Sequence, residues 1–521
     1  MLLRYTMLSL VLFLLTPCWV VAQTDSAVVV APDAAAISEI AEQARATWNV
    51  PGLCVAVVKD GQVVLATGFG TREAGKPELV NGDTVFAIAS NTKAFTSAVL
   101  AMLEEDGRVH WNDPVQQHLP WLQLYDPWVS AELRVDDLLC HRSGLGTFSG
   151  DLLWWGTPYS AEEVLRRTKH LPADGPFRAH YGYSNLMFLA AGEVIAKADG
   201  RPWADSVTER ILKPLDMNRT ATSVTQLPAL GNVATPHKTT ETGNEPIPWV
   251  NWDTMAAAGG INSSANDMAK WVRVQLDRGK VDESRRLFST ASSRRMWTSH
   301  VAMSISESAQ RRSPTTHFRA YGLGWVLSDY KGRLTVSHGG GYDGMYSQVL
   351  LVPDENLGIV VLTNSMTGIA TPLAQTIADR FLGGEQKDWL SEGLENDRSS
   401  RTAFLKRIED TVTPKATGTM PSHPLPEYTG TFRCPMYGDA TVTEQNGSLV
   451  LSLLPYPDLV ADLEHLHYDT WRIRWRQKFA WFGDGAIQFV PDTTGAFQEL
   501  RLDVPNDDLW FYELKLKRVA Q

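Results

Sequence analysis

The sequence predicts an α+β protein, in which helices flank an antiparallel sheet and form a helical subdomain, followed by a small C-terminal antiparallel β domain. Three observations support this class: a β-hairpin pattern early in the chain, helical patterns in its middle, and short strand patterns that return late. The length of 521 residues favours two or three domains. We expect a signal peptide at 1–22, a first domain at 23–384, a linker at 385–427 and the β domain at 428–521.

Composition and charge are those of a soluble globular protein, with 44% hydrophobic and 21% charged residues. The formal net charge of −11 disfavours nucleic acid as a partner, because its backbone is also negatively charged. The chain that follows the signal segment carries Cys54, Cys140 and Cys434. This odd and sparse set predicts no disulfide framework.

Residues 1–22 have the pattern of a secretory signal. Arg4 supplies a positive start, a largely apolar run extends from Met7 to Leu15, and Val20-Val21-Ala22 precedes a cut, so the mature chain is expected to begin at Gln23. A membrane anchor is the alternative, but the run is shorter than the roughly 20 residues that span a bilayer. We therefore expect a periplasmic or secreted protein without a membrane span after signal removal.

The elements before the middle of the chain are a helix, a hairpin and a strand that leads into a helix. An amphipathic helix is expected at 32–48. The hairpin has β-rich runs that start at Leu53 and Gln62, joined by Lys59-Asp60-Gly61, a turn of the Asp-Gly type. A short apolar strand then runs into a long apolar helix across Thr84–Leu103.

Helical patterns dominate the middle, and strands follow. The helices are expected at 134–140, 161–170, 185–198, 203–215 and 265–276. From residue 321 onward, short polar turns separate strand-like runs, as in an antiparallel meander, and a helix at 371–381 closes the block. The runs lie at 322–327, 334–338, 346–352 and 357–363. The early hairpin and three or four late strands are expected to form one sheet.

The rest of the chain reads as a linker and a small β domain. Segment 385–427 is polar and rich in proline, with one helix expected at Ala403–Glu409. In the β domain, Trp471–Arg476 alternates apolar and basic residues, which favours a solvated strand face over one that binds an acidic surface or substrate. His465 and His467 share a strand face without an evident third ligand, so a solvated edge is favoured over a metal site.

The stretch around Ser90 carries the first catalytic candidate. Ser90 stands where the apolar strand meets the apolar helix, and Lys93 follows one turn later on the same helix face. A serine in this place is most often an N-cap. A lysine within an apolar helix is a poor choice unless its charge is used, because a desolvated lysine loses pKa and can act as a base. Free N–H groups at the helix start suit an oxyanion beside Ser90.

A second candidate is Tyr183-Ser184-Asn185, which precedes an apolar helix. A tyrosine hydroxyl can take a proton from Ser90 if a neighbouring cation lowers its pKa. The Asn185 amide can bond both Lys93 and a substrate carbonyl. Taken alone, this motif is more typical of a packed tyrosine and a helix-capping asparagine.

A third candidate, His338-Gly339-Gly340-Gly341, ends a strand-like run. Consecutive glycines weaken a strand, so they indicate close approach of a ligand to the backbone or a bend. An N–H near Gly341 can be a second oxyanion donor. His338 can place a proton or a positive charge beside Tyr183 or a substrate carboxylate.

With these three motifs together, the chain from about Asp33 to Gly384 resembles the serine β-lactamase and penicillin-binding protein family, specifically the class C β-lactamase-like serine hydrolases. The fold that this resemblance implies is β-lactamase/transpeptidase-like. Supporting local matches lie at 111–114, 135–145 and 258–264. The block from Tyr428 resembles the small β domain that often follows such hydrolases.

The resemblance also implies roles for the site residues. It implies that Ser90 is the acylated nucleophile, Lys93 its proton partner and Tyr183 the general base. It implies that Asn185 is a ligand of substrate and of Lys93, and that the N–H groups of Ser90 and Gly341 form the oxyanion hole. No separate metal or cofactor is implied.

One departure from the family pattern bears on the substrate. His338-Gly339-Gly340 stands where many relatives have Lys-Thr-Gly, whose lysine helps to hold the carboxylate of a β-lactam or of a D-alanine terminus. A histidine is only partly charged at neutral pH, and esterases and peptidases of this family often carry one. We therefore expect a substrate that is an ester or a small amide or peptide, a cell-wall-derived one included. The alternatives are a D-Ala-D-Ala carboxypeptidase or β-lactamase, and a non-catalytic cell-wall or ligand sensor.

Overall fold

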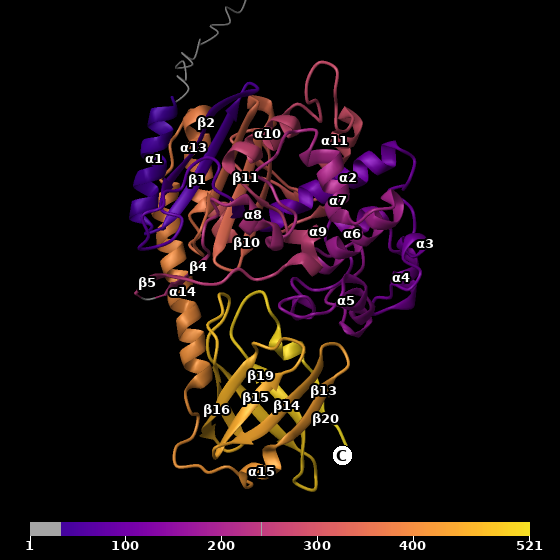
Figure 1. Ribbon diagram of the computed structural model, residues 1–521, viewed down its shortest axis with the longest axis vertical. Coiled ribbons are helices and arrows are strands. Elements are labelled where there is room, and N and C mark those ends of the chain that lie inside the picture. Colours follow the sequence, from indigo (N-terminus) through magenta and orange to yellow (C-terminus); the bar gives the residue numbers. More distant parts are fainter. Residues whose placement is uncertain (1–32, 241, 521) are drawn as a thin grey trace, which may run out of the picture.

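The computed structural model describes residues 33–240 and 242–520, and the predicted signal peptide at 1–22 lies outside them. The described chain forms two parts that are joined by one long helix (Figure 1). The first part is built on an open sheet with helices, and the second is a closed β-barrel. Within 33–240 and 242–520, no helix is long and apolar enough to cross a membrane.

An eight-stranded antiparallel sheet forms the centre of the first domain, in the order β2-β1-β12-β11-β10-β9-β8-β7. Its strands are β1 (Gly52–Lys59), β2 (Gln62–Gly70), β7 (Val301–Ala302), β8 (Arg319–Tyr321), β9 (Val326–Tyr330), β10 (Arg333–Tyr342), β11 (Met345–Val352) and β12 (Leu357–Thr363). The prediction of one sheet from the early hairpin and the late strands is confirmed. The sheet is wider than expected because β7 and β8 are too short to show alternation in the sequence.

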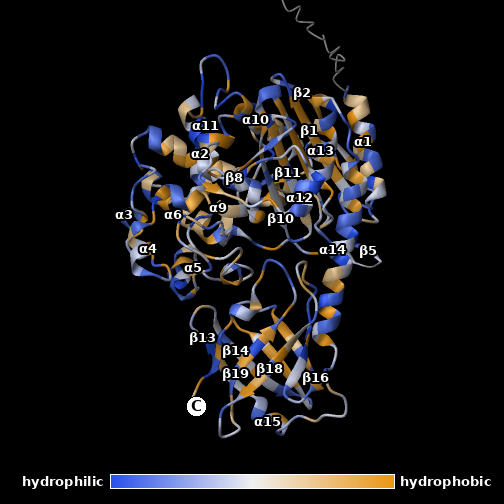
Figure 2. Ribbon diagram, turned by 180° about the vertical axis from the view of Figure 1, so that it is seen from behind, coloured by the Kyte–Doolittle hydropathy of each residue, from blue (hydrophilic) through white to orange (hydrophobic). Residues whose placement is uncertain are grey.

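Helices cover both faces of this sheet. The interior strands β1 and β12 are almost entirely buried and carry mostly hydrophobic residues (Figure 2). Helices α1 (Ala34–Thr47) and α13 (Ala370–Leu382) pack on the face where Val55 lies. Helix α10 (Ala265–Leu276) and the helical region cover the opposite face, where Ala56 lies. Burial on both faces is why these strands read as continuous apolar runs.

Helix α2 (Thr92–Glu105) crosses the centre of the helical region, and 11 of its side chains are buried. A helix that is apolar on every side must be surrounded by other elements, and α2 contacts three helices. They are α6 (Asn185–Asp199), α7 (Trp203–Val207) and α9 (Ala256–Gly259). The helix predicted at 203–215 is split, since α7 continues as a π-helical turn at Thr208–Leu212.

The C-terminal domain is a closed antiparallel barrel of β13–β20, which confirms the predicted small antiparallel β domain. Its strands are β13 (Gly430–Cys434), β14 (Gly438–Gln445), β15 (Ser448–Leu453), β16 (Val460–His467), β17 (Thr470–Trp475), β18 (Gly485–Pro491), β19 (Phe497–Asp503) and β20 (Leu516–Arg518). Side chains fill its interior: Phe432, Leu451, Ile473 and Phe489 are at most 1% exposed. Because these large side chains pack against one another, the barrel has a protein-like core rather than an open lumen along them.

The segment expected to be a linker is largely one helix. Helix α14 (Trp389–Val412) has 24 residues, far more than the helix expected at Ala403–Glu409. Along this fully described helix Trp389 alone is buried, so no apolar stripe marks the helical period in the sequence. Because α14 is exposed along most of its length, the sequence pattern predicts only a small part of this helix.

The arginines of strand β17 lie on its outer face, while Trp471 and Ile473 are buried in the barrel. Arg472 pairs with Asp484 and Arg474 with Glu464, and Arg476, which directly follows the strand, pairs with Asp462. A face whose charges are neutralised in this way supports the interpretation of a solvated strand face rather than a site for an acidic partner.

The described cysteines and His465 lie outside the cleft. Cys54, Cys140 and Cys434 are buried and free. His465 Nε2 lies 2.8 Å from the carbonyl oxygen of Tyr468. Across residues 33–240 and 242–520, no group of three or more His, Cys, Asp or Glu side chains is placed to hold a metal ion.

The rim of the barrel docks on the helical region of the first domain. The Glu513 carboxylate accepts hydrogen bonds from the Ser149 hydroxyl at 2.6 Å and from the Gly150 N–H at 2.9 Å. The indole N–H of Trp510 donates to the carbonyl of Thr147 at 2.7 Å. These bonds hold the last loop of the barrel against 147–150, a segment that leads into the cleft.

Candidate active site

Ser90 lies at a tight junction between a strand and a helix. The chain passes from β3 (Phe86–Ala87) through a 3-10 turn at Ala89–Asn91 into α2. Ala89 has a φ of 46°, in the left-handed region that costs a non-glycine residue free energy. The turn thus holds Ser90 at the N-terminus of α2, where its side chain lines a cavity of about 300 Å³.

Lys93 lies beneath Ser90 and is fully buried. Its Nζ is 2.9 Å from Ser90 Oγ, 2.8 Å from Asn185 Oδ1 and 2.9 Å from the carbonyl oxygen of Ala258. Burial lowers the pKa of the Lys93 amine from 10.5 to about 7, and the nearby Asp151 opposes this shift only in part. At neutral pH the amine therefore exists in both its charged and its neutral form, beside the hydroxyl of Ser90.

Tyr183 and Asn185 reach the same place from the start of α6. Tyr183 is hydrogen-bonded to Ser90, and its ring centroid lies 4.8 Å from Lys93 Nζ. Burial raises the pKa of the Tyr183 hydroxyl well above its ordinary value of 10.0, and this outweighs the opposite effect of the bond to Ser90. Tyr183 therefore carries its proton at neutral pH, whereas the amine of Lys93 is partly deprotonated.

Asp151 is a member of the site that the sequence motifs do not mark. Its carboxylate accepts a hydrogen bond from Asn185 Nδ2 at 2.7 Å and another from the indole of Trp154 at 3.0 Å. Burial raises its pKa to about 8, although both donors act in the opposite direction. Because Asn185 donates to Asp151, its Oδ1 is turned toward Lys93. The Ser-Gly-Asp context of Asp151 looks like an ordinary turn, which hides this role in the sequence.

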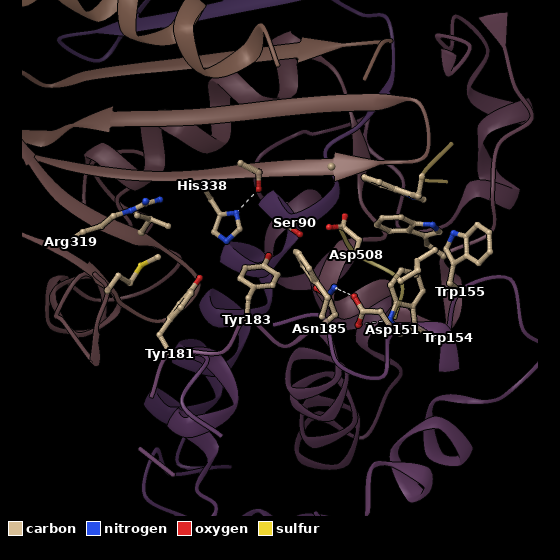
Figure 3. A pocket seen from close by; sticks show the side chains of 18 residues that line it. Ser90, Asp151, Trp154, Trp155, Tyr181, Tyr183, Asn185, Arg319, His338 and Asp508 are labelled. Atoms are coloured by element: carbon tan, nitrogen blue, oxygen red, sulfur yellow. Dashed lines mark hydrogen bonds between the residues drawn. The ribbon is translucent and has the colours of Figure 1, made fainter. Parts of the chain in front are cut away.

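His338 lies on β10 across the cleft from Tyr183 (Figure 3). Its Nε2 is 2.7 Å from the hydroxyl of Tyr321. Burial, assisted by the positive charge of Lys93, lowers the pKa of His338 to about 3. His338 is therefore neutral at physiological pH, which disfavours the alternative that it places a positive charge in the cleft. A histidine in water is partly charged at neutral pH, but burial disfavours the charged form of the His338 ring.

Two further side chains hold the walls of the cleft. The ring of His141 lies 4.0 Å from the ring of Tyr183, measured between centroids, and 4.4 Å from that of Tyr321. His141 Nδ1 accepts the backbone N–H of Ser184 at 3.0 Å. His141 thus packs against the loop that carries Tyr183, while Tyr321 orients His338.

The three glycines after His338 differ in what they permit. Gly339 and Gly341 line the cavity, whereas Gly340 faces the Ser90 turn. A Cβ on Gly340 would lie 2.2 Å from the carbonyl oxygen of Ile88 and 2.4 Å from Ser347 Oγ. The glycine at 340 is therefore required by close approach of the strand to the turn that carries the nucleophile candidate, rather than by a ligand.

We expect Gly340→Ala to lower the free energy of unfolding by about 1–3 kcal/mol, the usual cost of overpacking a filled site. Gly339→Ala is the matched control, since its Cβ would make an ordinary contact at 3.4 Å. Urea unfolding of both variants measures the difference. Equal stability of the two would show that the contact with Ile88 is not the reason for this glycine.

The cavity is closed by residues that are far apart in the chain. Figure 3 shows Ser90, Tyr183 and Asn185 at its centre, Tyr181 and Arg319 toward one end, and the cluster around Asp151 toward the other. The barrel adds Trp481, Asp508 and Leu509 to the lining. Sequence reasoning missed these residues because no local pattern connects the barrel to the cleft.

The site combines a serine with a buried lysine that loses its proton near neutral pH, and a tyrosine and an asparagine lie beside them. This is the arrangement of the Ser-x-x-Lys serine hydrolases. The comparison with known families agrees, because the model described as Beta-lactamase matches residues 37–382. The chain belongs to this family and is a β-lactamase-like serine hydrolase, as the resemblance implied. A second model, described as a domain of unknown function (DUF3471), matches residues 414–518.

Relatives with names extend this comparison. The chain is 30% identical over 427 residues to unguisins hydrolase ungD' of Aspergillus campestris, which covers 78% of this chain and 77% of the relative. It is 27% identical over 341 residues to protein flp of Staphylococcus aureus, over 63% of this chain and 62% of the relative. The match with protein flp thus spans less than two thirds of either chain.

Solved structures share the fold. The octameric penicillin-binding protein homologue from Pyrococcus abyssi superposes with a TM-score of 0.61 at 20% identity and covers 94% of this chain and 100% of its own. A D-stereospecific amidohydrolase from Streptomyces sp. gives a TM-score of 0.54 at 25% identity, over 68% of this chain and 100% of its own. The first likeness concerns the fold of nearly the whole chain, barrel included.

Proposed function

We propose that the protein is an exported serine hydrolase that forms an acyl-enzyme on Ser90 and hydrolyses esters or small amides and peptides. The observation that carries this proposal is the 2.9 Å contact between Ser90 Oγ and the Nζ of Lys93, whose pKa burial lowers to about 7. A neutral amine next to a serine hydroxyl is the arrangement that activates a serine as a nucleophile.

In the proposed mechanism, Ser90 Oγ attacks the substrate carbonyl while its proton moves to the Lys93–Tyr183 pair. A bond forms between Oγ and the carbonyl carbon, and the carbonyl oxygen becomes an oxyanion that the N–H groups of Ser90 and Gly341 stabilise. The bond to the leaving group then breaks. Because Tyr183 is a protonated phenol hydrogen-bonded to Ser90, it is placed to pass that proton on to the leaving group.

Release of the acyl group reverses these steps with water. The neutral Lys93–Tyr183 pair takes a proton from water, the hydroxide attacks the acyl carbon, and Ser90 recovers its proton as the acid leaves. Asn185 holds Lys93 through Oδ1 and offers its second Nδ2 hydrogen to the substrate, since the first is donated to Asp151. The original proton of Ser90 thus departs with the leaving group, a proton from water replaces it, and Lys93, Tyr183 and Ser90 end the turnover in their starting protonation states.

The substrate class rests on the neutral state of His338. A site without a fixed positive charge at this position gives little help to the carboxylate of a β-lactam or of a D-alanine terminus. The names of the relatives, a hydrolase of unguisins and a D-stereospecific amidohydrolase, support amide or peptide bonds as targets. D,D-carboxypeptidase or β-lactamase activity and a purely binding role are the competing outcomes of the test.

The test is incubation of the mature protein with short p-nitrophenyl esters, a chromogenic cephalosporin and a D-Ala-D-Ala peptide, together with labelling by a fluorophosphonate. We expect ester turnover, and a covalent adduct that mass spectrometry places on Ser90. A stable β-lactam adduct without turnover would favour the peptidase or the sensor. Labelling at a different serine would overturn the proposal.

Export is tested separately. Expression of the full chain in a Gram-negative host, followed by fractionation, is expected to give periplasmic protein that begins at Gln23. Protein recovered from the cytoplasm with residues 1–22 intact would argue against export.

The pH profile provides a further prediction. Below about pH 7 the Lys93 amine holds its proton and cannot accept that of Ser90, so kcat/KM for p-nitrophenyl acetate should rise with pH through about 7. The inflection belongs to the coupled Lys93–Asp151 pair rather than to one group. A rate that is flat from about pH 5 to about pH 9, after subtraction of the spontaneous hydrolysis, would contradict a lysine base.

A further inference from the structure

The barrel places a carboxylate in the cleft of the hydrolase domain. Asp508 lies on the loop between β19 and β20, and its side chain lines the same cavity as Ser90. The loop is tied down, because Asn506 Oδ1 accepts the backbone N–H of Asp508 at 3.1 Å and that of Leu509 at 2.5 Å. The bonds of Trp510 and Glu513 to the hydrolase domain anchor the same loop.

The Asp508 carboxylate is left without a partner. Among the described residues, no hydrogen bond or ion pair reaches its oxygens, and Figure 3 shows them directed into the cavity beside Ser90. Burial, with Asp507 and Asp343 nearby, raises its pKa to about 7. A desolvated carboxylate without a donor is costly, so a cationic group in the cavity would be bound strongly.

The other acidic group near the barrel is already satisfied. Asp343 accepts indole N–H groups from Trp252 at 3.0 Å and from Trp155 at 3.3 Å, and a further bond comes from Trp481. These bonds orient three tryptophans along the cavity wall at this end. Trp481 also covers the strand beside the oxyanion site, since a Cβ on Gly341 would lie 3.3 Å from its ring.

The position of Tyr183 decides which part of the substrate meets Asp508. The leaving group takes its proton from Tyr183, so it lies toward Tyr181 and Arg319, at the opposite end of the cavity from Asp508 (Figure 3). Arg319 is exposed there and is without an ion-pair partner within the described chain, so this end repels a cation. The acyl group then occupies the end that holds Asp508 and the tryptophans.

We propose that Asp508 binds an ammonium group on the acyl part of the substrate, so that the enzyme prefers amino-acyl esters, amides and peptides with a free amino group close to the scissile carbonyl. This inference rests on the proposed acylation of Ser90. The tryptophans accept an apolar or aromatic side chain on the same acyl group, and their rings add attraction for the cation. The barrel is in this view a specificity element that completes the site from outside the hydrolase domain.

The test uses the full mature chain and a pair of probes that differ at one amine. The boronic acid analogue of phenylalanine, in both configurations, and its N-acetyl derivative compete with a fluorophosphonate for Ser90, which requires no turnover. We expect the free amine to protect at a concentration about 10- to 100-fold lower than the acetylated probe, in at least one configuration. In Asp508→Asn this ratio should fall to about one.

Controls separate the charge of Asp508 from other effects. Asp507→Asn removes the neighbouring carboxylate, which is exposed and paired with Arg407 at 2.8 Å, and should keep the ratio. Asp508→Glu keeps the negative charge and should retain most of the ratio between the two probes. This second variant keeps the inference testable if Asp508→Asn does not fold. Equal protection by both probes, or a ratio that survives in Asp508→Asn, would overturn the inference while Ser90 is still labelled. If Ser90 is not labelled in the wild type, the proposed function itself fails.

Discussion

Replacing Ser90 by alanine is expected to lower kcat for p-nitrophenyl esters by about 10⁴-fold or more, because it removes the atom that forms the acyl-enzyme. Activity that remains would come from the oxyanion donors and from substrate positioning. Stability should change little, since Ser90 is at the cavity surface and the alanine keeps the turn at Ala89–Asn91. Stopped-flow release of p-nitrophenol measures both the burst and the steady state.

Ser97→Ala is the matched control for this prediction. Ser97 lies two turns further along α2, is fully buried, and its hydroxyl has no partner among the described residues. The same loss of a hydroxyl there should leave kcat within about twofold of the wild type and should not lower the stability. Turnover that survives in Ser90→Ala, or an equal loss in Ser97→Ala, would rule out Ser90 as the nucleophile.

Replacing Lys93 by methionine is expected to lower kcat by about 10³-fold, within the range typical of a lost general base. Methionine has a similar length and is apolar, so it fills the buried space but cannot accept the proton of Ser90. Its three acceptors, Ser90 Oγ, Asn185 Oδ1 and the carbonyl of Ala258, lose their donor. The residual activity should no longer show the inflection near pH 7 that the wild type owes to this amine.

Lys197→Met provides the control for charge and size, because Lys197 is exposed on α6. It should keep the activity and the pH profile of the wild type. The profile is the decisive readout, since a merely structural role of Lys93 would lower the rate at every pH by the same factor. An inflection near pH 7 that persists in Lys93→Met would assign the titration to another group.

The motifs of the sequence were sufficient to locate most of the candidate site. Ser90 and Lys93 are one helical turn apart, so their contact follows from local geometry alone. The contact of Lys93 with Asn185 joins residues 92 positions apart, and only the combination of motifs and the family resemblance connected them. Most of the sheet could also be predicted, because interior strands such as β1 are buried on both faces and the shortest strands lie at one edge.

What the sequence missed are properties that arise from packing. The charge state of His338 depends on its burial, and residue type alone suggested a partial positive charge. The same holds for Tyr183, whose pKa is raised by burial, and this is why we propose the Lys93 amine as the group that accepts the proton of Ser90. Asp151 escaped notice because its bond to Asn185 joins residues 34 positions apart in the sequence, and no recognisable motif links them.

The sequence by itself determined the fold class, the strand-helix junction that carries Ser90, and the proximity of Ser90 to Lys93. Local periodicity predicts the elements, and a spacing of three residues on a helix predicts the contact. The tertiary structure decided the protonation states and the shape of the cleft. It also brought Asp508 and Trp481 of the barrel into the cavity that contains Ser90. Contacts between separate domains produce no periodic pattern in the sequence of either segment. The specificity that we propose for Asp508 could therefore be inferred only from the tertiary structure.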